Sequence, residues 1–119
     1  VALVTVTVFD LGGDVSESPD ATVQLTQGED SSNNPAINAT LLRNENVDFL
    51  YLSDGTNEWG NENADAADGD GLNNAGDIIS TADNNDDGAS VTLSSGDTIN
   101  VIAVLPDGTE EVLTSTEVE

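Results

Sequence analysis

Apolar and polar residues alternate along several short stretches of this chain. The alternation is clearest in Ala21–Thr26, where Val23 and Leu25 fall on one face and threonine and glutamine on the other. A period of two over four to eight residues predicts a half-buried β-strand. The same argument predicts strands over residues 37–42, 90–93, 98–105 and 109–118, and the nearly continuous apolar run at 47–52 predicts a central strand.

Turn-forming residues separate these stretches. Pro106-Asp107-Gly108 is a strong hairpin signal, because proline presets the first turn position and glycine accepts a positive φ. No helical periodicity interrupts the pattern after residue 21. Short strands joined by Gly, Asn and Asp turns predict a mainly β fold over residues 21–119, an antiparallel β-sandwich of immunoglobulin-like type.

Residues 53–88 differ from the rest, being rich in Asn, Asp, Ala and Gly. A structureless loop of this length is unusual in a compact domain. We therefore expect an acidic surface insertion that is held by the one tryptophan, Trp59, and by Leu72, Ile78 and Ile79, with a short strand at Ile78.

The N-terminal stretch Val1–Val15 (VALVTVTVFDLGGDV) supports two interpretations. Val4, Val6 and Val8 alternate with threonines, which favours a strand of β-branched residues. The pair Gly12-Gly13, followed by a polar linker through Asp20, is instead typical of a helix end. The two interpretations predict different proteins.

Charge narrows the choice of partners. The chain has 119 residues, with 24 acidic residues against one basic residue and a formal charge of −23. One basic residue is too few to bind a series of phosphates, which argues against nucleic acid and anionic lipid as partners. At molar salt the screening length falls to about 3 Å, so this one-signed surface is typical of a halophile's protein.

Composition also argues against an enzyme. The sequence contains neither cysteine nor histidine. Its serines and threonines therefore lack a conventional base, and the chain can form neither a thiolate nucleophile nor a thiolate metal site. Carboxylate pairs arise by chance in so acidic a chain, and none lies in an obviously apolar setting that would raise a pKa. We expect no catalytic residues and no resident cofactor.

Calcium is the one metal ion for which the sequence contains a candidate binding loop. Asp83, Asn85 and Asp87, followed by Gly88, fit the start of a calcium loop in which alternate side-chain oxygens surround the ion. Ser94 stands where such a loop would have its closing bidentate glutamate. The alternative is a solvated acidic loop.

One modification signal is present. Asn38-Ala39-Thr40 is an N-glycosylation sequon on the polar face of a predicted strand, from which a glycan would project outward.

Two parts of the chain together resemble a known family. Residues 8–25 (VFDLGGDVSESPDATVQL) resemble the point at which the N-terminal helix of haloarchaeal type IV pilins leaves the filament core, and residues 93–118 resemble the closing hairpin of those subunits. The middle of the chain has no counterpart in this comparison. The family's peptidase site and most of its helix do not match either, so Val1 would lie well inside a truncated helix.

The resemblance implies a secreted structural subunit that polymerises with copies of itself. Residues 1–11 would be an α-helix in the filament core, residues 12–20 a linker with a hinge at Gly12 and Gly13, and residues 21–119 the solvent-facing sandwich. The part of the helix outside this sequence would contact the membrane before assembly. On this basis we favour the helix over the strand. The helix residues expected to contact other copies are Val1, Leu3, Val4, Val6, Val8, Phe9 and Leu11.

The leading hypothesis is an extracellular pilus-like filament for adhesion or cell contact. An archaellum filament subunit shares the same plan but serves motility. A different class of protein, a secreted halophilic binding module with calcium as a candidate stabilising ion, would use Val1–Phe9 as its first strand.

Overall fold

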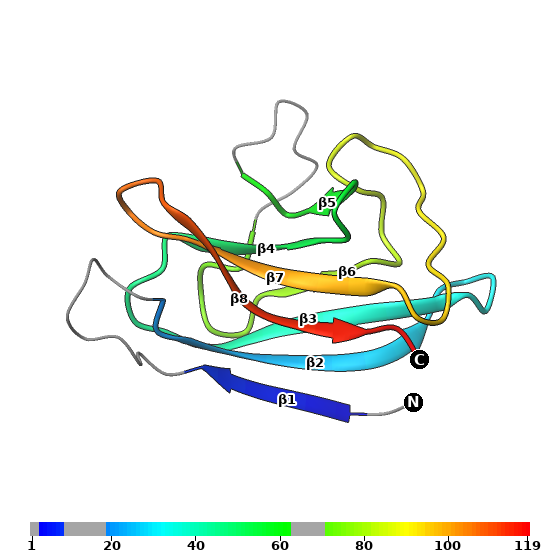
Figure 1. The fold of residues 1–119 in the computed structure, drawn as a ribbon, viewed down its shortest axis with the longest axis horizontal. Coiled ribbons are helices and arrows are strands. Elements are labelled where there is room, and N and C mark those ends of the chain that lie inside the picture. Colours follow the sequence, from blue (N-terminus) through cyan, green and yellow to red (C-terminus); the bar gives the residue numbers. More distant parts are fainter. Residues whose placement is uncertain (1–2, 9–18, 63–70) are drawn as a thin grey trace.

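A computed structural model describes the backbone of residues 3–8, 19–62 and 71–119, and the side chains of residues 19–62 and 71–119. These residues form eight strands in two four-stranded antiparallel sheets (Figure 1). Sheet A has the order β1-β2-β3-β6, and sheet B has the order β5-β4-β7-β8. The strands of sheet A are β1 (Leu3–Val8), β2 (Ala21–Glu29), β3 (Pro35–Asn44) and β6 (Ile78–Ser80). Those of sheet B are β4 (Phe49–Ser53), β5 (Glu58–Trp59), β7 (Thr98–Val104) and β8 (Glu110–Glu117).

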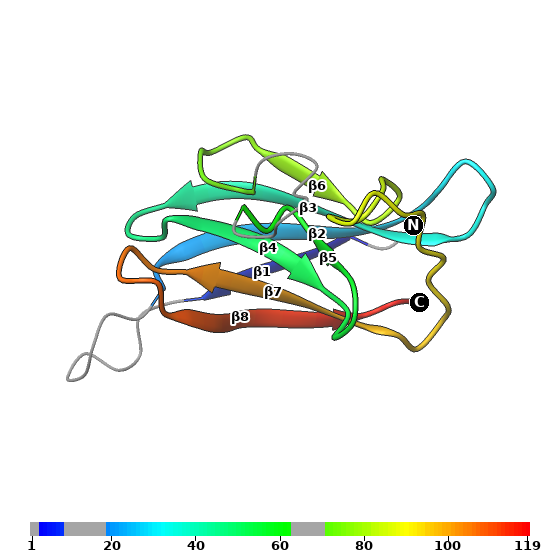
Figure 2. The same ribbon diagram turned by 90° about the horizontal axis from the view of Figure 1, so that it is seen from above.

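The two sheets stack face to face, with β4 and β7 above β2 and β3 in Figure 1. The view from above in Figure 2 shows that the strands of the two sheets run in similar directions. Alternating residues of both sheets fill the space between them. In β2 the side chains of Val23 and Leu25 are buried, whereas Thr22 and Gln24 are partly exposed. The predicted mainly β fold with two antiparallel sheets is thereby confirmed.

The order of the strands differs from the predicted immunoglobulin type. In an immunoglobulin domain the third strand lies in the sheet opposite the second. Here β3 pairs with β2 in the same sheet, because the connection between them is a short turn closed by Asp30. The Asp30 carboxylate accepts hydrogen bonds from the backbone N–H of Ser32 at 2.8 Å and of Asn34 at 2.9 Å.

The predicted N-terminal helix is wrong for the residues that the structure describes. Residues 3–8 form β1, which pairs antiparallel with β2 from Leu3 opposite Thr26 to Val8 opposite Ala21. The alternation of valine and threonine accounts for this result, since β-branched residues fit an extended backbone better than a helix. The register sets Val4, Val6 and Val8 opposite the buried Leu25, Val23 and Ala21.

The insertion at residues 53–88 contains two short strands. Trp59 lies in β5 and is 2% exposed, so the prediction that it anchors this region is confirmed. Its indole N–H donates to the backbone oxygen of Asp83 at 3.1 Å. The strand expected at Ile78 is β6, and Leu72 is buried beside Leu50 in a single β-bridge. The strand predicted at residues 90–93 does not form, although Leu93 packs in the core.

Candidate functional site

The first candidate site is the N-terminal segment, because the resemblance assigned polymerisation to it. Leu3, Val4, Val6 and Val8 lie in β1, at one edge of sheet A. Only β2 pairs with this strand, so its other edge has no partner strand in the described part of the chain (Figure 1). Val1, Phe9, Leu11 and the predicted hinge residues Gly12 and Gly13 lie outside the described residues.

Charge distinguishes β1 from the other sheet edges that the structure describes. Natural proteins protect their edges with very short strands or with charged side chains, since an unprotected edge pairs with another chain. β5 has two residues and β6 has three, while β8 is long but carries Glu110, Glu111 and Glu117. β1 has six residues, LVTVTV, and no charge. It is therefore the edge that is open to strand pairing.

The second candidate site is the predicted calcium loop. Asp83 and Asp87 are exposed, whereas Asn85 is 3% exposed. The side-chain oxygen of Asn85 accepts hydrogen bonds from the backbone N–H of Asp87 at 3.0 Å and of Ala89 at 2.9 Å. A carbonyl oxygen has two lone pairs, so two such bonds occupy its capacity to accept. As the loop stands, Asn85 acts as a turn-forming residue, and calcium would have to displace these bonds.

Acidic side chains do not gather elsewhere into a metal site. Within residues 19–62 and 71–119, no three or more acidic side chains are arranged to hold a metal ion. The calcium hypothesis at Asp83, Asn85 and Asp87 stays a prediction, and the hydrogen bonds of Asn85 argue against it.

Asp86 has a role that the sequence analysis missed. It is 5% exposed, and its carboxylate accepts hydrogen bonds from the backbone N–H of Gly60 and of Asn61, both at 2.8 Å. Its own N–H donates to the backbone oxygen of Glu58 at 2.7 Å. These three bonds fasten the acidic loop to the chain just after β5. No local pattern signals them, because the partners lie about 25 residues apart in sequence.

The glycosylation candidate Asn38 lies on β3, between Thr26 of β2 and Ser80 of β6. Its side chain is half-buried on the outer face of sheet A, together with Thr40 of the sequon. A Cβ placed on Gly28 would lie 2.9 Å from the Asn38 Nδ2, so the glycine leaves room for this amide. Use of the sequon stays a prediction.

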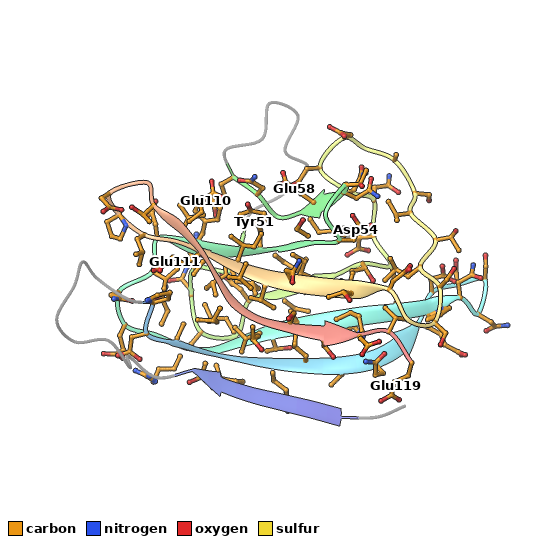
Figure 3. The ribbon with its side chains drawn as sticks, in the orientation of Figure 1. Tyr51, Asp54, Glu58, Glu110, Glu111 and Glu119 are labelled. Atoms are coloured by element: carbon orange, nitrogen blue, oxygen red, sulfur yellow. The ribbon has the colours of Figure 1, made fainter. Side chains whose placement is uncertain are left out.

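The outer face of sheet B has a small apolar cluster of Phe49, Tyr51 and Val104, with Ile102 packed against it. The Tyr51 hydroxyl donates a 2.6 Å hydrogen bond to the Glu110 carboxylate, and Figure 3 shows these two residues side by side. Burial, followed by the bond to Glu110, raises the pKa of the Tyr51 phenol well above its usual value. This phenol therefore stays protonated at neutral pH and is a weaker acid than free tyrosine.

The single basic residue of the sequence, Arg43, forms ion pairs with two acidic side chains. Its guanidinium bonds Asp20 and lies 3.4 Å from Glu45. The hydrogen bond from Arg43 to Asp20 raises the pKa of the guanidinium further. Arg43 thus joins the entrance of β2 to the end of β3 and is not available as an anion-binding group.

A shallow depression of about 300 Å³ lies at the far end of β2. Gln27, Gly28, Glu29, Pro35 and the C-terminal Glu119 line it. Two of these five residues are acidic and none is basic, so the depression has no group that would hold an anionic ligand.

No protein-family model matches this chain, and no curated protein is significantly similar to it. No helix in the described ranges is long and apolar enough to cross a membrane. The resemblance to pilins rests on the sequence of this chain alone and has no support from these comparisons.

Proposed function

We propose that this chain is a structural, non-enzymatic subunit of an extracellular pilus-like filament that serves adhesion or cell contact. Its copies assemble through the N-terminal segment. The observation that carries the proposal is the position of β1, an uncharged edge strand that pairs with β2 alone among the described strands, in a chain of formal charge −23. Copies of so acidic a protein repel each other, so an uncharged edge is where they can approach.

The proposal keeps the segment that the pilin resemblance assigned to assembly but not its helical conformation, because residues 3–8 are a strand. The remainder of the chain suits a scaffold. Every buried side-chain nitrogen or oxygen in the described part of the sandwich has a hydrogen-bond partner. Such groups stabilise a rigid module, whereas active sites commonly strain or perturb their polar groups.

Electron microscopy of cells grown in molar salt tests the function. Cells that lack the gene should lose a class of surface filament and adhere less, and the intact gene should restore both. A copy that carries Asp48→Asn, a change at an exposed residue just before β4, is a matched control and should restore filaments equally. Unchanged filaments in the deletion strain would overturn the proposal. Loss of swimming with unchanged adhesion would assign the chain to an archaellum instead.

A secreted halophilic binding module is the second candidate. One observation favours it, because β1 pairs with β2 over six residues as the first strand of such a module would. The codons that precede Val1 distinguish the two. A short leader and a further run of about 15 apolar residues support the filament, whereas an ordinary export signal supports the module.

A further inference from the structure

We propose that two copies of this chain pair through β1, edge to edge and antiparallel, so that the two A sheets become one continuous sheet. This inference names one contact within the self-assembly proposed above, the pairing of two copies, and rests on that function only for its biological role. Because a two-fold pair closes on itself, a filament joins such pairs through a second contact. The partner is a second copy of the chain.

The free edge of β1 is suited to this contact for two reasons: its backbone groups are available for pairing, and its residues carry no charge. An edge strand presents unpaired N–H and C=O groups that can pair with another strand. The six residues Leu3–Val8 contain no acidic side chain, although one residue in five of the whole chain is charged. The described edges at β5, β6 and β8 offer two residues, three residues and a strand with three glutamates. β1 is therefore the edge that combines length with neutrality.

Identical copies favour a pairing that closes on itself. A two-fold axis makes the same surface contact itself, and dimers of this kind are the commonest oligomers. An antiparallel contact between two β1 strands satisfies this symmetry with the axis perpendicular to the sheet. A pairing of β1 with the three-residue β6 would provide fewer hydrogen bonds and would not close.

The faces of the sheet restrict the register. Val4, Val6 and Val8 stand opposite buried residues of β2, so they occupy the core-face positions of β1. In a continuous sheet the core-face positions of one copy must stand opposite those of the other. This condition leaves two central registers. Either Thr5 faces Thr5 of the second copy, or Val6 faces Val6 and Thr5 faces Thr7.

Salt should control the association. With a formal charge of −23 on each copy, the repulsion between two copies is large at low ionic strength. In molar salt the screening length is about 3 Å, and short-range strand pairing then outweighs the repulsion. We therefore expect pairs in molar potassium chloride. At lower salt concentrations at which the protein is still folded, we expect single chains.

Sedimentation velocity in molar potassium chloride tests the contact with a charge variant. Thr5→Glu puts two like charges at the contact and should weaken self-association at least about tenfold, which corresponds to about 1.4 kcal/mol. Ser115→Glu is the matched control, because it adds the same charge to an exposed position of the already acidic β8. It should leave the association unchanged. Equal weakening by both changes, or a single-chain wild type at every salt concentration, would overturn the inference.

Disulfide trapping tests the register and does not depend on how well Thr5→Glu folds. The chain has no cysteine, so an introduced thiol has no native competitor. Residues that face each other on antiparallel strands have Cα atoms about 4.5–5.5 Å apart, within the range of a disulfide. Thr5→Cys should form linked pairs in the first register, and a mixture of Thr5→Cys with Thr7→Cys chains should do so in the second. Ser115→Cys reports random collisions. Linkage no faster than that of Ser115→Cys in both cases would overturn the inference.

The two proposals fail in different ways. If filaments are present but their subunits show no linkage through β1, the function stands and the contact is wrong. If the chain forms linked pairs in solution but cells that lack the gene keep their filaments, the contact stands and the function is wrong.

Discussion

The side-chain amide of Gln27 joins the two sheets by bonding the backbone on both sides of the end of β8. Its Nε2 donates to the backbone oxygen of Glu117 at 2.9 Å, and its Oε1 accepts from the backbone N–H of Glu119 at 3.2 Å. Gln27 stands at a core-face position of β2 and is 6% exposed. Figure 3 shows Glu119 beside the end of β2. One amide therefore holds the C-terminal strand of sheet B against sheet A.

Gln27→Leu should destabilise the fold by about 1–3 kcal/mol, because it leaves the Glu117 carbonyl without its donor and the Glu119 N–H without its acceptor while keeping a similar volume. Urea unfolding in molar salt measures the change. Gln24→Leu is the matched control, since Gln24 lies on the same strand but on the outer face. Gln24→Leu should lower the free energy of unfolding clearly less than Gln27→Leu does. Equal losses for the two variants would show that the bonds from Gln27 contribute little.

Asp86→Asn should loosen the attachment of the acidic loop to the residues after β5. An amide keeps one acceptor oxygen but sets its NH₂ group against a backbone N–H of Gly60 or Asn61, at a cost of about 1–3 kcal/mol. Hydrogen exchange at these two amides should accelerate, whereas Asp87→Asn at the exposed neighbouring position should not change it. Equal exchange in both variants would contradict the role assigned to Asp86.

Tyr51 is the only tyrosine in the chain, so its ionisation can be followed directly by absorbance. Burial, with the bond to Glu110, raises the pKa of the folded protein's phenol above the ordinary value of about 10. A raised pKa adds stability that is fully present below about pH 10 and is lost as the pH rises towards the folded value.

We therefore expect tyrosinate to appear only above the usual pH range and together with alkaline unfolding. Tyr51→Phe should remove this part of the alkaline pH dependence of stability. Ordinary titration near pH 10 in the folded protein would contradict the burial of the phenol and its bond to Glu110.

Three turn carboxylates should make stability fall in acid. Hydrogen bonds from backbone N–H groups, chiefly those of Asn34 and Thr109 respectively, lower the pKa of Asp30 and of Asp107. Burial alone would raise the pKa of Asp54, but bonds from Asn57 and Thr56 outweigh it and lower the pKa. A lowered folded pKa gives stability that is present above the unfolded value of about 4 and is lost as the pH falls through the folded value.

Protonation also reduces the repulsion among carboxylates, so the acid effect should be measured in molar salt, where that repulsion is screened. Urea midpoints should decrease between pH 6 and pH 3. Asp30→Asn is the informative variant, because an asparagine oxygen can close the same turn without titrating. It should flatten the pH dependence, and an unchanged slope would exclude a contribution from the Asp30 turn.

The sequence predicted those elements whose signal is local. The alternation around Val23 and Leu25 and the turn at Pro106-Asp107-Gly108 correspond to β2 and to the β7–β8 hairpin. The apolar run at Phe49–Leu52 is the central part of sheet B, as expected. The interpretation of the N-terminus failed because a family resemblance was set above the periodicity of Val4, Val6 and Val8.

What the sequence did not predict depends on contacts between distant residues. Nothing near Asp86 indicates that its carboxylate bonds the amides of Gly60 and Asn61, and nothing near Gln27 indicates the end of β8. The neutrality of β1 is visible in the sequence, but its meaning depends on the strand being an edge, which only the strand order reveals. Long-range pairing is therefore the information that turns a neutral stretch into a candidate contact.

The central claim is that copies of this chain assemble through the N-terminal segment into a surface filament. The most direct measurement is immunogold electron microscopy of cells in molar salt, with antibodies raised against the purified chain. We expect labels along the whole length of filaments, and loss of those filaments when Thr5→Glu replaces the wild type but not when Ser115→Glu does. Label confined to the medium or to a filament-free cell surface would contradict it.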